Sequence, residues 1–345
     1  MNGARGACAT RPWRPGWWRV LAGVRGLLIA CLVALAGCAS DPPVVVPAGT
    51  WLQVDHDIAA ASRDAEQQAR DNALLSMERW KELVYQQTDD EFIPWFSSYW
   101  TQQWLGLKVS WYKLSAGGDK DPTVGRLALY LQEQYQERVL EPVAEDDDPK
   151  QIMERSTRLY IEQLGLQLQG IAQRHGVPEE QFDQRLQAIT LISQAPGASL
   201  YEVLHAKRLE RMPAYMALIA HIHAAPGGLG DWSADPGISQ VAQRTSERLV
   251  DDMTTSGAAS AVSAMAGRVA GPAISLGVAL FNAVAHEDER EQTQAQLRQN
   301  LNAAFDREWL TLMSSTERGV LAGVAQLAGQ IDSGLARPFK YEPSR

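Results

Sequence analysis

Apolar residues recur along most of the chain at spacings of three and four, the period of one face of an α-helix. Alternation typical of strands is almost absent, and helix-start signals recur in three Asp-Pro pairs that fit an N-cap followed by proline. These patterns predict an all-α, multi-helix bundle. The clearest faces are Tyr160, Leu164, Leu168 and Ile171, and Leu297, Leu301, Phe305, Trp309 and Leu312; the pairs are Asp121-Pro122, Asp148-Pro149 and Asp235-Pro236.

Loop signals suggest how this helical body is divided. A Gly- and Pro-rich stretch at 226–236 predicts a linker between two helical domains, 55–225 and 237–345. Near the C-terminus, Ser314 and Glu317 have capping-box spacing, which predicts a final helix that runs to about Ser333 with Gly334 as its C-cap.

The first 37 residues differ from the rest of the chain. They carry five arginines and no acid, and they end in an apolar run, Leu27 to Leu35, of about the length of a signal-peptide core. A permanent membrane-spanning helix needs about 20 such residues. We therefore expect residues 1–37 to be a cleaved signal peptide; Val24, which precedes Arg25, would also serve as a translation start for a leader of ordinary size.

The sequence Leu35-Ala36-Gly37-Cys38 resembles the lipobox of bacterial lipoprotein precursors. That resemblance implies cleavage before Cys38, diacylglycerol on its thiol and a fatty acyl chain, such as palmitate, on the new N-terminus. Ala39 follows, where the enterobacterial retention signal for the inner membrane has Asp, so the resemblance favours the outer membrane, facing the periplasm. Residues 38–54 are expected to form the acylated N-terminus and an extended, Pro-rich tether.

Removal of the leader sharpens the charge balance. Lys+Arg falls from 32 to 27 against 41 acids, which leaves a net charge of −14 on 308 residues. A chain this acidic is poorly suited to a nucleic-acid backbone. All three cysteines lie at or before residue 38, so the mature chain has neither a structural disulfide nor a cysteine nucleophile.

Aromatic residues are concentrated between Phe92 and Trp111. On one continuous helix they share about half of the circumference, with Ser97, Thr101 and Lys108 opposite. The favoured interpretation is a core helix; the alternatives are an exposed groove for a carbohydrate or partner helix, and a membrane-interface belt. The candidate partner-binding residues are Trp95, Tyr99, Trp100, Trp104 and Trp111.

Residues 257–285 contain 17 Gly, Ala or Ser among 29 residues, and Arg268 is their single charged side chain. Gly267 and Gly271 have GxxxG spacing, and such small residues let helices approach closely. A buried hairpin that turns near Gly271-Pro272 is favoured, with membrane insertion or a homo-oligomer contact as alternatives. The candidate residues are Gly267, Arg268, Gly271 and Gly277, and Gly319 and Gly323 are a possible packing partner.

Chemical motifs are lacking: the six histidines are scattered, and there is no HExxH, GxSxG, P-loop or EF-hand pattern. We therefore expect no catalytic residue, metal or cofactor. The sequence favours a non-enzymatic, lipid-anchored adapter, structural or assembly factor that contacts the membrane through Cys38 and binds another cell-envelope protein. The alternatives are a membrane-active protein that inserts residues 257–285 and a periplasmic enzyme with an unrecognised site.

Overall fold

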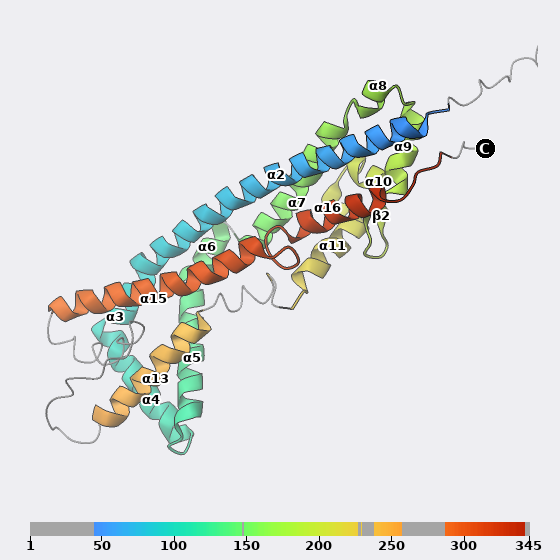
Figure 1. The fold of residues 1–345 in the computed structure, drawn as a ribbon. Helices are drawn as coiled ribbons and strands as arrows, with labels where there is room; N and C mark the ends of the chain where they lie inside the picture. The colour runs from blue at the N-terminus through green and yellow to red at the C-terminus, as the bar shows by residue number, and fades with distance from the viewer. Residues whose placement is uncertain (1–44, 147, 227–228, 230–237, 257–286, 342–345) are drawn as a thin grey trace, which may run out of the picture. The chain divides into compact units, whose positions relative to one another are not determined.

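A computed structural model describes residues 45–146, 148–226, 229, 238–256 and 287–341. The predicted all-α class is confirmed (Figure 1). In chain order the elements are α2 (Ala48–Gln87), η1 (Thr88–Phe92), α3 (Ile93–Ser97), α4 (Tyr99–Ser115), α5 (Lys120–Tyr135), η2 (Gln136–Leu140), α6 (Glu141–Asp146), α7 (Pro149–Leu168), α8 (Ile171–His175), α9 (Glu179–Ala188), β1 (Thr190–Ile192), β2 (Ala198–Ser199), α10 (Leu200–Leu204), η3 (Leu209–Arg211), α11 (Pro213–His223), α13 (Ser239–Ser256), α15 (Glu287–Ser314) and α16 (Ala322–Leu335). Here η1 and η2 are π-helices, η3 is a 3₁₀-helix, and β1 and β2 form a short antiparallel hairpin.

Helix α2 is the centre of the bundle, and α7 packs along it. The buried stripe of α2 is built largely from alanines, which allow the two helix backbones to approach closely. Within this contact, the hydroxyls of Ser62 and Tyr160 share a buried hydrogen bond of 2.8 Å. The buried stripe includes Ile58, Ala61, Ala65, Ala69, Ala73 and Met77.

The C-terminal helices pack on the same framework. Both α15 and α16 contact α2, and α16 also contacts α7. The indole Nε1 of Trp309 donates to the carbonyl oxygen of Met77 at 3.1 Å, and the Lys81 ammonium lies 4.5 Å from the Trp309 ring centroid. Residues Val46–Glu342 therefore form one compact unit. Most of the predicted linker, residues 227–228 and 230–236, lies outside the described residues, so the division into domains 55–225 and 237–345 stays a prediction.

Helix α2 begins earlier than the predicted tether allows. The tether was expected to extend to residue 54, but Ala48 is already helical, and the Pro47 carbonyl accepts the first backbone hydrogen bonds. Trp51 is buried with its ring 4.7 Å from that of Phe339. Tertiary packing thus extends the helix to the residue after the last proline.

Two of the predicted helix ends need correction. The last helix starts at Ala322 and includes Gly334, which packs against Ile189 and does not cap it. Gly323 packs against Thr157 of α7, whereas the small-residue segment, its predicted partner, lies outside the described residues. Of the Asp-Pro pairs, Asp148 caps α7 as predicted, whereas Asp121 lies inside α5; Asp235-Pro236 is outside the described residues.

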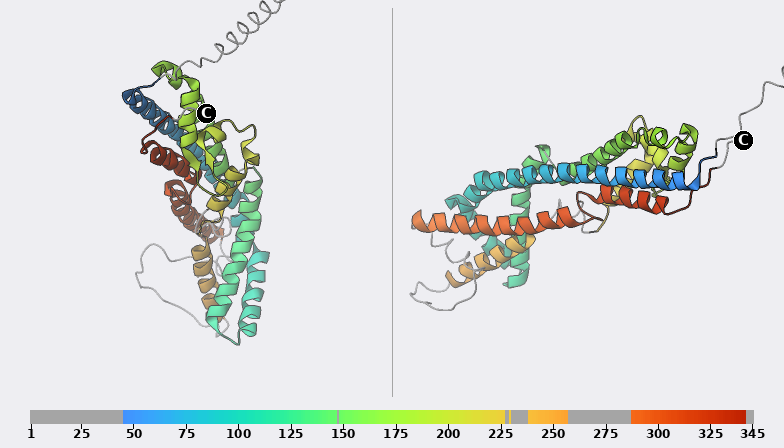
Figure 2. Two further views of the ribbon diagram at one scale, coloured as in Figure 1. Left: turned by 90° about the vertical axis from the view of Figure 1, so that its right-hand side faces the viewer. Right: turned by 45° about the horizontal axis from the view of Figure 1, so that its top comes forward.

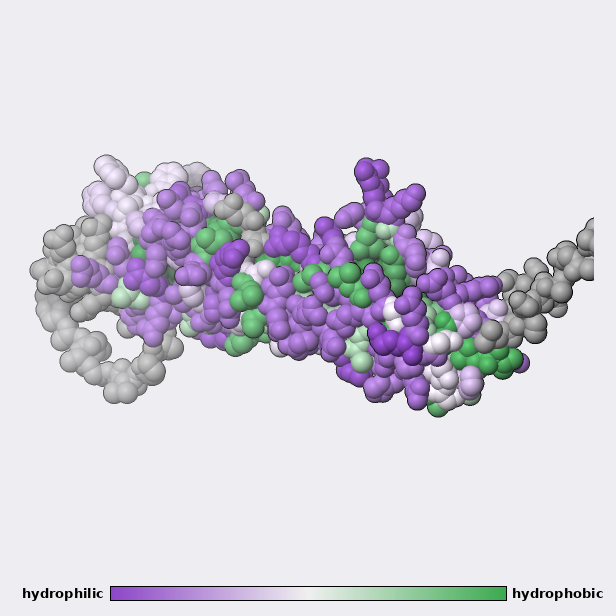
Figure 3. Space-filling view, turned by 90° about the horizontal axis from the view of Figure 1, so that it is seen from above, coloured by the Kyte–Doolittle hydropathy of each residue, from purple (hydrophilic) through white to green (hydrophobic). Residues whose placement is uncertain are grey.

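Helices α4, α5 and α13 form a separate layer at the end of α2 that leads into η1 (Figures 1 and 2). Both α4 and α13 pack against α5, and Lys120 pairs with Asp251 at 2.7 Å. This layer presents α4, the most aromatic segment of the chain, at the surface. Hydrophilic residues cover most of the face drawn in Figure 3, where hydrophobic atoms occur in separate patches.

Candidate interaction surface on α4

The aromatic segment is not one continuous helix. The continuous helical stretch formed by α2, η1 and α3 ends at Ser98, whose backbone is extended (φ −69°, ψ 143°). Helix α4 starts at Tyr99. The Ser98 side-chain oxygen accepts a hydrogen bond from the Thr101 backbone N–H at 3.2 Å, which caps α4. The change of direction at Ser98 separates the aromatic residues before it from those after it.

Aromatic residues before the break are in the core. Phe92, Ile93 and Phe96 are buried, and the Phe92 ring lies 5.0 Å from that of Tyr135. Burial raises the pKa of the Tyr135 hydroxyl, which shares a hydrogen bond of 2.9 Å with Thr88. Trp95 is half-buried beneath the Arg138 guanidinium, at 4.6 Å. For this half of the segment, the core interpretation holds.

After Ser98, the side of the helix that faces the core is partly polar. The side of α4 that packs inward consists of Thr101, Gln102, Leu105 and Val109, although Thr101 was expected on the outer side. Gln102 donates its Nε2 to the Phe96 carbonyl oxygen at 2.5 Å, and so ties α4 to α3. Two polar residues therefore occupy the inward face that the sequence pattern assigned to aromatics.

The large apolar residues of α4 face outward. Trp100, Trp104, Leu107, Trp111 and Leu114 form a stripe that we call the aromatic seam. The core interpretation is wrong for the tryptophans of the seam and for the adjacent Tyr99. The exposed fractions are 49% for Tyr99, 80% for Trp100, 52% for Trp104, 64% for Leu107, 68% for Trp111 and 78% for Leu114.

The spacing of the seam is regular. Its members follow one another at intervals of four, three, four and three residues, which is the a/d spacing of a coiled-coil helix over two heptads. A stripe restricted to a and d positions is narrower than the apolar face of an ordinary globular helix. Leu114 was not among the candidate partner-binding residues. The sequence signal that identifies it is the continuation of the four-three spacing past Trp111.

The segment that carries the seam has few charged residues. From Phe92 to Gly118 the chain has no acid, and its charges are Lys108 and Lys113. The Lys108 ammonium lies 3.9 Å from the Tyr130 ring centroid and 5.5 Å from that of Trp104, so it borders the seam and holds α4 to α5. Apolar contact, and not ion pairing, therefore dominates what this surface offers a ligand.

The size of the seam also separates it from an ordinary surface. At about 250 Å² for a whole tryptophan side chain, its three tryptophans expose about 500 Å². Patches of about 300–600 Å² are the largest on a typical monomer and are often functional. With Tyr99, Leu107 and Leu114 included, the α4 surface lies at or above that range.

Capping by Ser98 is testable. Replacement of Ser98 by alanine removes the acceptor for the Thr101 N–H, and we expect the free energy of unfolding to fall by about 1 kcal/mol. Urea denaturation followed by circular dichroism measures this change. Ser110→Ala is the control, because the Ser110 hydroxyl bonds only the Gly106 carbonyl on the exposed side of α4; an equal loss in both variants would contradict the capping role.

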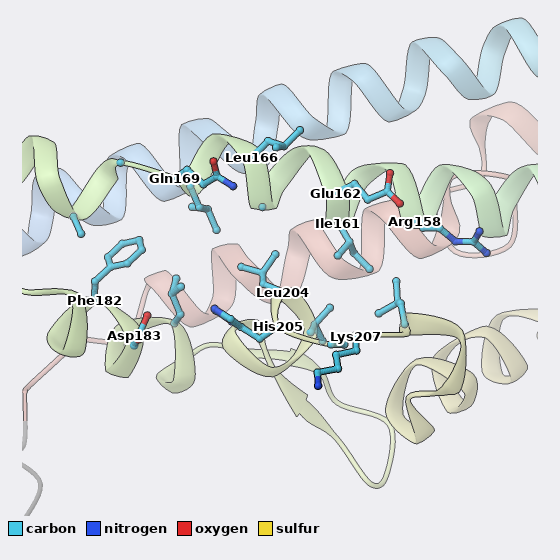
Figure 4. Close-up of a pocket in the computed structure, with 18 of the residues that line it drawn as sticks. Arg158, Ile161, Glu162, Leu166, Gln169, Phe182, Asp183, Leu204, His205 and Lys207 are labelled. Atoms are coloured by element: carbon cyan, nitrogen blue, oxygen red, sulfur yellow. The ribbon is translucent and has the colours of Figure 1, made fainter.

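A second surface feature is an open cavity of about 830 Å³ beside α7 (Figure 4). Arg158, Glu162 and Leu166 line it from α7, and Phe182 and Asp183 line it from α9. Two of its polar groups contact neighbouring side chains: Arg158 pairs with Glu210 at 3.4 Å, and His205 stacks on Tyr201 and bonds its carbonyl oxygen at 2.9 Å. These contacts do not form a nucleophile–base arrangement, so we assign no chemistry to this cavity.

Other predicted sites have different outcomes. Cys38, Gly267, Arg268, Gly271 and Gly277 lie outside the described residues. Within the described part of the chain, no three His, Cys, Asp or Glu side chains come together as metal ligands, and no helix is long and apolar enough to cross a membrane. Comparisons with protein-family models, curated proteins and solved structures find no match to this chain.

Proposed function

We propose that this protein is a non-enzymatic, lipid-anchored adapter or structural factor of the bacterial cell envelope, and that the aromatic seam of α4 is its docking surface. The observation that carries the proposal is the exposure of Trp100, Trp104 and Trp111 on a well-packed helix. Three tryptophans exposed to water contribute none of the stabilisation that burial of their side chains would give. Aromatic residues are enriched in protein interfaces, where such side chains become buried.

The form of the seam favours a helix as its ligand. A sugar-binding platform needs polar groups that meet the hydroxyls of the sugar, whereas the seam is flanked by few, such as Gln103 and Ser110. The a/d spacing instead provides a row of knobs that fit between the side chains of a facing helix. A docked helix would cover the length of α4 and exclude water from all five members of the seam.

Its position suits a tethered adapter. If Cys38 carries the lipid, the anchor is ten residues before Ala48, the first residue of α2. At 1.5 Å per residue the 40 residues of α2 extend about 60 Å, and η1, α3 and α4 follow its far end. Helix α2 thus acts as a spacer that separates the lipid-anchored N-terminus from the docking surface.

Site-specific photocrosslinking in the native envelope tests this function. A photoreactive amino acid in place of Gln103, which is exposed beside the seam, should give a discrete adduct of higher mass. The same amino acid in place of Leu310, which is 60% exposed on α15, is the matched control. Adducts equal in yield at both positions, or none at Gln103, would reject the docking role.

The anchor is tested separately by metabolic labelling with a palmitate analogue. We expect label on the wild-type chain and none on Cys38→Ser, which should also leave the membrane fraction. Label retained by Cys38→Ser would refute lipidation at this thiol and leave the docking surface to be judged by the crosslinking result alone.

A further inference from the structure

We infer that the occupant of the aromatic seam is the α4 seam of a second copy of this chain, so that the protein is a homodimer with two antiparallel α4 helices at its interface. This inference rests on the docking role proposed above and names the partner. Three properties of the seam support it: its area, its lack of acidic residues and the order of its large and small residues.

The exposed area of the seam is close to what one partner of an interface buries. A standard interface buries about 800 Å² on each partner. The three tryptophans expose about 500 Å² at about 250 Å² for a whole side chain, and Tyr99, Leu107 and Leu114 add to this area. Burial of the seam against its equal therefore approaches the area of a stable dimer.

The acidity of the chain as a whole does not extend to the seam. No acid lies between Phe92 and Gly118, so two seams can meet without bringing like-charged carboxylates together. Lys108 is held over the rings of Tyr130 and Trp104 at the border of the seam. The contact is therefore free of repulsion between carboxylates, and the like charges that it brings together are those of Lys108 and Lys113 on the two copies.

The order of residues favours antiparallel pairing. With Trp104 and Trp111 at a positions, Trp100, Leu107 and Leu114 occupy d positions. Parallel pairing would set each tryptophan against the same tryptophan of the second copy. Antiparallel pairing sets a against d, so that Trp111 faces Leu107 of the second copy and Trp104 faces its Leu114. Two of the three tryptophans then meet smaller residues, which fills the interface without overpacking, while Trp100 lies opposite Gly118, beyond the end of α4 at Ser115.

Sedimentation of the compact unit 46–342 tests the inference. We expect a dimer, with a dissociation constant raised about a hundredfold or more by Leu107→Ser, because two leucines leave the interface of each dimer. Leu310→Ser, which changes an equally exposed leucine on α15, should leave dimerisation unchanged. Circular dichroism checks that both variants fold. A wild-type monomer over a wide range of concentrations would overturn the inference.

Engineered cysteines test the orientation, because Cys8, Cys31 and Cys38 all lie outside residues 46–342. A Leu107→Cys unit mixed with a differently tagged Trp111→Cys unit should form a mixed disulfide. Leu107→Cys mixed with Leu310→Cys should not. Preferential pairing of Leu107→Cys with itself would indicate parallel helices and overturn the antiparallel arrangement.

Two other occupants would give distinct results. Binding of the unit as a monomer to vesicles of phosphatidylethanolamine and phosphatidylglycerol, lost in Leu107→Ser, would show that the seam contacts lipid and would overturn the inference. A Gln103 photoadduct whose mass differs from that of two copies would also overturn it. That adduct would still support a docking surface, so failure of the inference is distinguishable from failure of the proposed function.

Discussion

Replacing Arg185 by alanine is expected to lower the free energy of unfolding by about 3–5 kcal/mol, the cost of leaving one partner of a buried ion pair alone. Arg185 of α9 is 1% exposed, and its guanidinium donates two hydrogen bonds to Asp55 of α2, from Nε at 2.7 Å and from Nη2 at 3.0 Å. It also lies 5.3 Å from the Phe339 ring centroid. One side chain thus joins α2, α9 and the C-terminal segment.

Two comparisons make this expectation specific. Arg174→Ala removes an exposed guanidinium from Asp57, only two residues from Asp55, and should cost at most about 1 kcal/mol. The double variant Asp55→Ala with Arg185→Met removes both charges, so we expect it to be more stable than Arg185→Ala. Guanidinium denaturation measures all three free energies. Equal losses for Arg185→Ala and Arg174→Ala would show that burial does not govern the pair.

Replacing Gly323 by alanine is expected to destabilise the protein by about 1–3 kcal/mol through overpacking. A Cβ at this position would lie 2.1 Å from the Thr157 Oγ1 atom of α7. Thr157 is buried and its hydroxyl donates to the Met153 carbonyl at 2.8 Å, so it has little freedom to move away. The close approach of α16 to α7 therefore depends on the missing side chain of Gly323.

Gly329 supplies a matched control in the same helix. A Cβ there meets nothing within 4 Å, so Gly329→Ala should raise stability by up to about 1 kcal/mol through helix propensity alone. Thermal denaturation of the two variants should give shifts of opposite sign. A gain in stability for Gly323→Ala would mean that α16 and α7 do not pack as closely as the structure places them.

The helical class and much of the core could be read directly from sequence spacing. Tyr160, Leu164, Leu168 and Ile171 are all buried, and Leu297, Leu301, Phe305 and Leu312 are buried on α15. Such spacing is reliable in long uninterrupted helices because a fixed rotation per residue keeps the apolar positions on one side. The capping role of Asp148 could be predicted for a similar reason, since it depends on neighbouring atoms only.

The candidate surface shows where this reasoning stops. Trp100, Trp104 and Trp111 were recognised as a group, but hydrophobicity favoured their burial, and the structure exposes them. The reason is the extended backbone of Ser98, which rotates α4 relative to α3, together with Gln102, whose bond to the Phe96 carbonyl makes a polar residue acceptable inside. Neither contact has a periodic signature in the sequence.

Local properties can be read from the order of residues alone: helical periodicity, the low charge of residues 92–118 and the lipobox-like Leu35-Ala36-Gly37-Cys38. Which helix faces are covered depends on how the helices pack against one another. Packing on α2 and α7 buries the apolar sides of α15 and α16, and the break at Ser98 turns the aromatic seam outward. Periodicity specifies that a helix has an apolar side, whereas burial of that side depends on contacts between residues far apart in the chain.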